Sequence, residues 1–220
     1  IDPGHGGIDP GAEAGDLREA DLVMGFAERL KAVLDATGRF DTVLTRTEDV
    51  TVSLDQRLSI ARAAGADVMI SLHADALEGE VDAAGLVVYR LEDTAGSAAD
   101  QRLVERHGPA DRLTGVDLGQ AGDDVTLALL EMARRETRTR NIALSSAILG
   151  GFRSSELVVN TRPERAGPFA VLKAADIPSV LIELGFLSTE ADLERLTSEA
   201  WQAEAAAALR DGLLLWAAED

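Results

Sequence analysis

The 220-residue chain has no cysteine, which excludes disulfides and thiolate metal ligands. No run of about 18 apolar residues occurs either, so the sequence predicts no membrane span. Basic residues are scarce, because 21 Lys and Arg stand against 39 Asp and Glu, for a formal net charge of -18. A chain this acidic repels nucleic acid and anionic membrane surfaces, so we expect neither as a partner.

Aromatic residues are also few, at 4%, yet hydrophobic residues make up 46% of the chain and suffice for a real core. Buried aliphatic strands are predicted at 67–72 (DVMISL) and 178–182 (PSVLI). Weaker strand candidates lie at 42–45, 85–91 and 169–172. Helical segments separate several of these strands, and that alternation favours an α/β fold with a mostly parallel sheet.

Three helices are predicted around the strands. Apolar residues recur at every fourth position over 22–34, which is typical of an amphipathic helix. A second helix is predicted over 54–64 and ends at Gly65. The Ala- and Leu-rich stretch 193–218 is the third.

The stretch from about 92 to 165 differs from the rest because it is polar and helical without clear flanking strands. Its strongest helix candidates are 125–138 and 142–149. We interpret it as a helical insertion within a single domain spanning 1–220. The chain opens abruptly on IDPGH, so we expect the natural protein to extend further toward its N-terminus and any export signal to lie there.

Polar side chains fall at the ends of the predicted strands. His5 follows the first strand, His73 follows DVMISL, and Glu183 ends PSVLI. The carboxyl ends of strands in open α/β sheets meet at one edge, where ligands gather. Glu19 precedes the first helix closely enough for the intervening loop to bring it beside His5. We therefore expect these four side chains to form one site.

Two imidazoles and one carboxylate with an open fourth position make a catalytic zinc site, whereas calcium and magnesium prefer all-oxygen shells. We predict one Zn²⁺ per chain, bound by His5, Glu19 and His73. Zinc lowers the pKa of water at the open position from about 16 toward 7. A carboxylate must still take the proton of that water, and Glu183 is the candidate.

Each predicted ligand also has an ordinary structural explanation. His5 is compatible with a loop histidine in a Gly-rich turn. His73 is compatible with a strand cap that hydrogen-bonds a backbone carbonyl. Glu19 is compatible with a carboxylate at the positive end of a helix dipole.

Glu183 has an alternative as well, because a carboxylate at the end of an apolar strand is costly to bury unless it is paired or functional. Arg46 and Arg57 are the candidate partners. The third histidine, His107, lies in the polar segment ERHGPAD and is predicted to be solvated.

Several motifs together resemble a known family, the zinc N-acetylmuramoyl-L-alanine amidases of the type that splits daughter cells. The resemblance covers nearly the whole chain in order and spacing. It rests on IDPGHGGIDPGA at 1–12, READLV at 18–23, TR at 45–46, SLDQRLSIA at 53–61, ISLHADA at 70–76 and VLKAADIPSVLIELGFLS at 171–188.

The resemblance implies that His5, Glu19 and His73 are zinc ligands and that Glu183 is the catalytic glutamate. It implies a mixed, mostly parallel sheet of about six strands flanked by helices. The implied reaction is hydrolysis of the amide that joins N-acetylmuramic acid to L-alanine in peptidoglycan. One departure is Thr189, where the family pattern leads us to expect Asn.

The resemblance further implies a regulatory insertion, a helix that a partner protein releases during cell division, and a periplasmic or extracellular location. A carboxylate is a competent fourth zinc ligand, so one near this helix would displace water and block substrate; the candidates are Asp123, Asp124, Glu131 and Glu136. The insertion is also compatible with a structural flap or a wider substrate groove. Two other functions stay open: a different zinc-dependent peptidase or amidase, and a non-catalytic cell-wall regulator.

Overall fold

The computed structural model describes residues 1–77, 84–107 and 123–219, with 123–131 and 219 described by their backbone alone. The helices are α1 (Glu19–Asp35), α2 (Leu54–Ala63), α3 (Ala98–Arg106), α4 (Asp123–Ser154), α5 (Glu190–Thr197), α6 (Glu199–Glu219) and the 3-10 helix η1 (Ala170–Leu172). The strands are β1 (Asp2–Pro3), β2 (Glu13–Ala14), β3 (Leu17–Arg18), β4 (Met69–His73), β5 (Leu86–Leu91), β6 (Val159–Gly167) and β7 (Ser179–Glu183).

A five-stranded sheet in the order β1-β4-β7-β5-β6 forms the centre of the described chain. β1, β4 and β7 are parallel, β5 runs antiparallel to β7, and β6 is parallel to β5. The predicted α/β class with a mixed, mostly parallel sheet is confirmed. The register pairs His73 with Glu183, so the last residues of β4 and β7 lie side by side.

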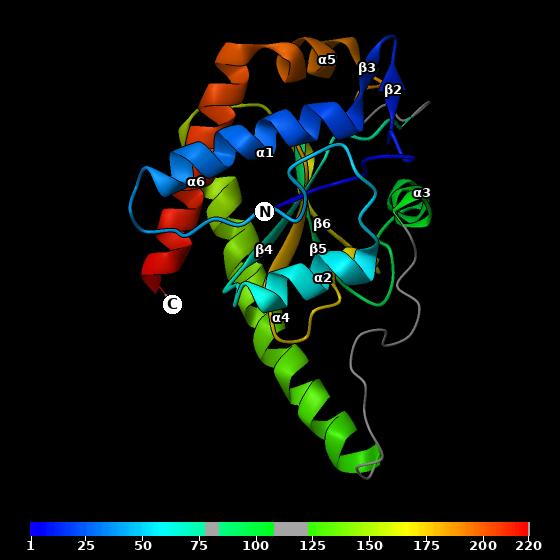
Figure 1. The fold of residues 1–220 in the computed structure, drawn as a ribbon, viewed down its shortest axis with the longest axis vertical. Coiled ribbons are helices and arrows are strands. Elements are labelled where there is room, and N and C mark those ends of the chain that lie inside the picture. The colour runs from blue at the N-terminus through cyan, green and yellow to red at the C-terminus, as the bar shows by residue number, and fades with distance from the viewer. Residues whose placement is uncertain (78–83, 108–122, 220) are drawn as a thin grey trace.

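Helices cover both faces of this sheet (Figure 1). Alternate strand residues such as Ile70 and Ile182 face a core shared with α1, α4 and α6. Their neighbours Met69 and Leu181 face a second core shared with α2, α3 and η1. This alternation explains why the central strands are apolar along their whole length, since both faces are buried.

The strongest sequence patterns correspond to real elements. The apolar residues of 22–34 form the buried face of α1, and Ser53 begins α2 with a capping box to Gln56. Gly65, with φ of 64°, follows the end of α2 as predicted. The stretch 193–218 is divided between α5 and α6.

Two weaker strand predictions are wrong. Segment 42–45 lies beside β1, and the Thr45 N–H donates to the Ile1 carbonyl at 3.0 Å, but it forms no strand. Residues 170–172 form η1 instead of a strand. β6 was not predicted, because an edge strand needs only one hydrogen-bonded neighbour and tolerates a polar sequence that contains Pro163.

The two helices predicted at 125–138 and 142–149 are one helix, α4, of 32 residues. Its C-terminal half is part of the core, where Leu144, Ile148 and Phe152 are fully buried. The Asn141 side-chain oxygen accepts from the Ser179 N–H at the amino end of β7. The first turns of α4 project past the sheet in Figure 1.

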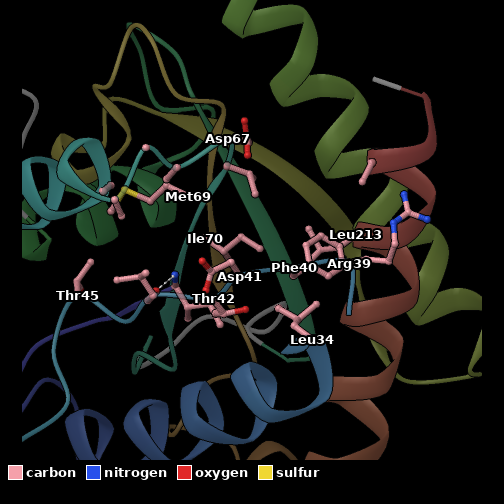
Figure 2. Close-up of a pocket in the computed structure, with 18 of the residues that line it drawn as sticks. Leu34, Arg39, Phe40, Asp41, Thr42, Thr45, Asp67, Met69, Ile70 and Leu213 are labelled. Atoms are coloured by element: carbon pink, nitrogen blue, oxygen red, sulfur yellow. Dashed lines mark hydrogen bonds between the residues drawn. The ribbon is translucent and has the colours of Figure 1, made fainter. Parts of the chain in front are cut away.

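A pocket of about 530 Å³ opens at the amino ends of β1 and β4 (Figure 2). Ile1, Met69 and Ile70 line it together with the segment Arg39–Thr42 and Leu213 of α6. It lies at the opposite end of the strands from His73 and Glu183. Within the described residues, no helix is long and apolar enough to cross a membrane.

Neighbouring glycines in α4 provide a test of how closely α4 and α6 pack. A Cβ at Gly151 would lie 2.2 Å from the Ala208 carbonyl oxygen of α6, whereas a Cβ at Gly150 would meet nothing within 4 Å. We expect Gly151→Ala to destabilise the fold by about 1–3 kcal/mol through overpacking. Gly150→Ala is the matched control and should gain up to about 1 kcal/mol from helix propensity. Urea unfolding of both variants measures the difference; equal stabilities would contradict the close contact.

Candidate functional site

Four strand and helix ends meet at the carboxyl edge of β1, β4 and β7. His5 follows β1, His73 ends β4, Glu183 ends β7, and Glu19 begins α1. The parallel pairing of these strands brings residues far apart in sequence to one edge. All four predicted residues are therefore brought together, and each is at most 8% exposed.

A buried ion pair positions the loop that carries His5. Arg57 of α2 donates to the Asp2 carboxylate and to the Pro3 and His5 carbonyls, each at 2.7 Å. Burial alone would raise the pKa of Asp2, but Arg57 and two hydroxyl donors hold that pKa below its ordinary value. His5 itself has a left-handed backbone with φ of 55°, a conformation that costs energy and that surrounding contacts must impose.

Glu19 lies between the two histidines. Its Oε1 is 3.2 Å from His5 Nε2 and 3.1 Å from His73 Nδ1, and it accepts from the Ala74 N–H at 2.9 Å. Burial would raise the pKa of Glu19, but its close contacts with the His5 and His73 rings lower that pKa well below its ordinary value. Burial and the nearby His107 lower the pKa of His73 to about 3, so this ring is neutral.

Hydrogen bonds to the far side of each ring orient the predicted ligand atoms. His5 Nδ1 lies 2.8 Å from the Asp9 carboxylate, which leaves Nε2 facing Glu19. His73 Nε2 lies 3.3 Å from the Ser71 hydroxyl, whose proton goes to Asp2, so Ser71 accepts from His73. With Nε2 of His73 protonated, its Nδ1 lone pair faces the site. Such outer partners are what orient metal-binding histidines.

These residues fit a zinc ion. Zinc bound tetrahedrally at about 2.0–2.1 Å holds neighbouring ligand atoms about 3.3 Å apart. The measured separations of Glu19 Oε1 from the His5 and His73 nitrogens are 3.2 and 3.1 Å. His5 Nε2 is buried without a hydrogen-bond partner, as a nitrogen kept for a metal would be. Gly4 allows the close packing, because a Cβ there would lie 2.2 Å from the His73 ring.

Glu183 faces the same space from β7. Its Oε2 accepts from the Asp75 N–H at 3.0 Å, which fixes the carboxylate. Its Oε1 is buried without a hydrogen-bond partner. Burial raises the pKa of Glu183, with His107 opposing that rise. A carboxylate with one oxygen fixed and one free is suited to accepting a proton from a water molecule.

The alternative partners for Glu183 are absent from its surroundings. Arg57 pairs with Asp2, as described above. The Arg46 guanidinium donates instead to the backbone carbonyls of Pro3, Gly4, Ala20 and Glu48. Both arginines support the loop after β1.

The prediction that His107 is solvated is wrong. His107 is 8% exposed, and its ring centroid lies 4.2 Å from that of His73. Its Nε2 is 3.2 Å from Asp75 Oδ2 and 3.5 Å from Glu183 Oε1. The sequence missed it because its neighbours are polar and only the end of α3 turns it inward. The sequence analysis also missed Asp75 as a site residue. Its position two residues after His73 in ISLHADA could have indicated that it lies at the same sheet edge.

Of the four insertion carboxylates named as candidates to reach the metal, the structure describes the side chain of Glu136. Glu136 is exposed on α4 and precedes Asn141, which marks the amino end of β7, so it lies opposite the site. The side chains of Asp123, Asp124 and Glu131 lie outside the described residues.

Comparison with known proteins agrees with this geometry. The family profile for N-acetylmuramoyl-L-alanine amidase matches residues 1–214. The amidase AmiC of Neisseria meningitidis serogroup B is 36% identical over 97% of this chain and 51% of its own length. AmiA of Escherichia coli K12 is 32% identical over 97% of this chain and 74% of its own length. The chain spans about half the length of the AmiC relatives it matches.

Solved structures share the fold. AmiC2 of Nostoc punctiforme is 27% identical, with a TM-score of 0.66 over 99% of this chain and 94% of that one. CwlD of Clostridioides difficile, solved in complex with the GerS lipoprotein, has a TM-score of 0.71 at 23% identity over 100% and 97% of the two chains. The profile match over nearly all residues, together with relatives above 30% identity, places this chain in the N-acetylmuramoyl-L-alanine amidase family.

Proposed function

We propose that the chain is a zinc-dependent amidase that cleaves the bond between N-acetylmuramic acid and L-alanine in peptidoglycan. The observation that carries the proposal is the convergence of His5, Glu19 and His73 at ligand spacing beside the free Oε1 of Glu183. Family membership supplies the substrate class. We further propose that the enzyme acts in the periplasm or outside the cell during cell division.

The chain's own groups have defined parts in this reaction. Zinc, when bound, would polarise the scissile carbonyl and make water a nucleophile near neutral pH. Glu183 Oε1 takes a proton from the attacking water and delivers it to the leaving nitrogen, so the C–N bond breaks to a lactyl carboxylate and a free L-alanine amine. Asp75 holds Glu183 through its backbone N–H and thereby fixes the direction of Oε1.

The insertion is proposed to hold the enzyme off until a partner protein releases it. Support comes from α3, whose end brings Arg106 and His107 onto Asp75 beside the site. CwlD, solved in complex with the GerS lipoprotein, is a family member bound to another protein. The regulatory part must be smaller than 92–165, because the C-terminal half of α4 packs in the core and β6 belongs to the sheet.

Metal analysis tests the ligand set. We expect one zinc per chain after reconstitution, and substitution of any one ligand by Ala should remove most of it. Asp9→Asn, which changes an outer partner of His5, should weaken zinc binding about 10–100-fold while leaving the three ligands in place. Inductively coupled plasma analysis and chelator competition measure both effects. Full zinc content in His5→Ala or His73→Ala would contradict this site.

Glu183→Gln tests the proton acceptor. The amide has the same shape but cannot take a proton, so activity should fall about 10²–10⁴-fold with zinc content unchanged. Dye release from labelled sacculi measures the rate, and mass spectrometry of parent digests should find stem peptides with a free L-alanine amine. Products cut elsewhere in the peptide would favour a peptidase, and a variant of near-parental rate would exclude Glu183 as the base.

Replacement of residues 95–136 by a Gly/Ser linker tests whether the insertion lowers the activity of the enzyme. This deletion removes α3 and the first turns of α4 but keeps Thr137, the buried residues that follow it in α4, and all of β6. We expect faster cleavage of sacculi at unchanged zinc content. Thermal unfolding serves as the control for folding. A folded, zinc-loaded deletion no faster than the parent would show that the insertion has another role.

A further inference from the structure

Asp75 is fully buried beside the candidate site, and its two carboxylate oxygens have different surroundings. Oδ1 accepts from the Ala76 N–H and pairs with the Arg106 guanidinium. Oδ2 is buried and has no hydrogen-bond partner among the described residues. The structural contacts of the Asp75 side chain therefore account for one oxygen and leave the other free.

The backbone around Asp75 fixes this free oxygen beside Glu183. The Asp75 N–H donates to Glu183 Oε2 at 3.0 Å, and the Asp75 carbonyl accepts from the Leu187 N–H at 2.7 Å. A carboxylate oxygen of Asp75 and one of Glu183 lie within 4.8 Å of each other. Glu183 Oε1, the proposed proton carrier, is also free of hydrogen bonds within the described part of the chain. Two free carboxylate oxygens on fixed backbone thus border one small volume.

A nitrogen atom in the structure shows what this volume accommodates. His107 Nε2 lies 3.2 Å from Asp75 Oδ2 and 3.5 Å from Glu183 Oε1, so a single nitrogen can contact both oxygens at once. A nitrogen that carries one hydrogen and receives another needs two such oxygens, one to accept its N–H and one to deliver the proton. The leaving nitrogen of an amide under hydrolysis has this requirement.

We propose that Asp75 Oδ2 accepts the N–H of the scissile amide and thereby directs the leaving nitrogen toward Glu183. The inference rests on the proposed amidase reaction. When water attacks the carbonyl carbon, the nitrogen loses its conjugation with the carbonyl, and its lone pair takes the proton from Glu183 Oε1 as the C–N bond breaks. The remaining acid proton moves to the released amine, so the products are a carboxylate and an ammonium.

Asp75 contributes to this step in two ways. The original N–H of the amide points away from the lone pair that receives the proton, and in a buried site it needs an acceptor in place of water. Asp75 Oδ2 is that acceptor. Its negative charge also stabilises the positive charge that develops on the nitrogen as the proton arrives.

A second metal held by Asp75, His107 and Glu183 is the competing interpretation of the same cluster. Arg106 argues against it, because its guanidinium already lies on the Asp75 carboxylate and would repel a cation. Glu183 Oε2 is also committed to the Asp75 N–H. An N–H donor, in contrast, needs only the one oxygen that Asp75 has free.

The test compares two substrates that differ in the N–H alone. They are a soluble N-acetylmuramoyl peptide and its depsipeptide analogue, in which L-lactate replaces L-alanine and an oxygen replaces the amide nitrogen. Asp75→Asn keeps the shape, but its single oxygen faces Ala76 and Arg106, which turns its NH2 group, a donor, toward the site. We expect the ratio of kcat/KM for the amide to that for the ester to fall about 10- to 100-fold, the effect of a lost hydrogen bond to a charged group.

Arg106→Ala is the matched control, because it removes the partner of Asp75 Oδ1 but leaves Oδ2 in place. Any change in the position of α3 alters access for both substrates, so this variant should keep the parental ratio. Glu183→Gln should slow both substrates, because each needs water to lose a proton. If Asp75→Asn does not fold, Asp75→Ala provides the same comparison.

Inhibitor binding gives a readout that needs no turnover. A phosphonamidate analogue of the substrate carries a P–N–H group, and the matching phosphonate carries a P–O group in the same place. In calorimetry the parent chain should bind the phosphonamidate more tightly, and Asp75→Asn should remove that preference.

The outcomes separate this inference from the proposed function. Equal losses on the amide and the ester in Asp75→Asn would make Asp75 a structural residue and overturn the inference. Two zinc ions per chain would overturn it in favour of the second metal. Failure of the proposed function would appear instead as a parent chain that cleaves neither substrate at the lactyl carbonyl, and the inference would then fall with it.

Discussion

The buried ion pair between Asp2 and Arg57 is the interaction on which the site depends. It joins β1 to α2, and the same arginine holds the carbonyl of His5. The other oxygen of Asp2 accepts from Ser71, which orients His73. Removing one partner of a buried pair typically costs about 3–5 kcal/mol, so the loss would disturb both histidines together.

This arrangement explains how a site so rich in charged groups folds at all. Glu19 is buried but receives two backbone N–H groups and faces two imidazoles. Glu183 and Asp75 are buried with one oxygen satisfied and one free. Free buried carboxylate oxygens are costly, and they persist at places where a metal, a substrate or a movable side chain completes them.

The stretch 92–165, predicted to be a helical insertion, contains parts of the core fold as well as parts that project from it. The C-terminal half of α4 is as much a part of the core as α1, and β6 completes the sheet. The first turns of α4 project past the sheet in Figure 1, and the Arg106 side chain at the end of α3 is half-exposed. The regulation proposed above therefore concerns only the projecting parts, because the buried half of α4 and β6 hold the sheet together.

Strand ends and apolar periodicity are local patterns, so the sequence was enough to predict the fold class and to propose His5, Glu19, His73 and Glu183 as site residues, which the structure brings together. It did not determine β6, whose polar residues pair only because a neighbouring strand offers its edge. Nor did it reveal His107, which local polarity assigns to solvent. Only the packing of α3 against the sheet turns that imidazole into the site, since burial at a helix end is decided by tertiary contacts and not by sequence neighbours.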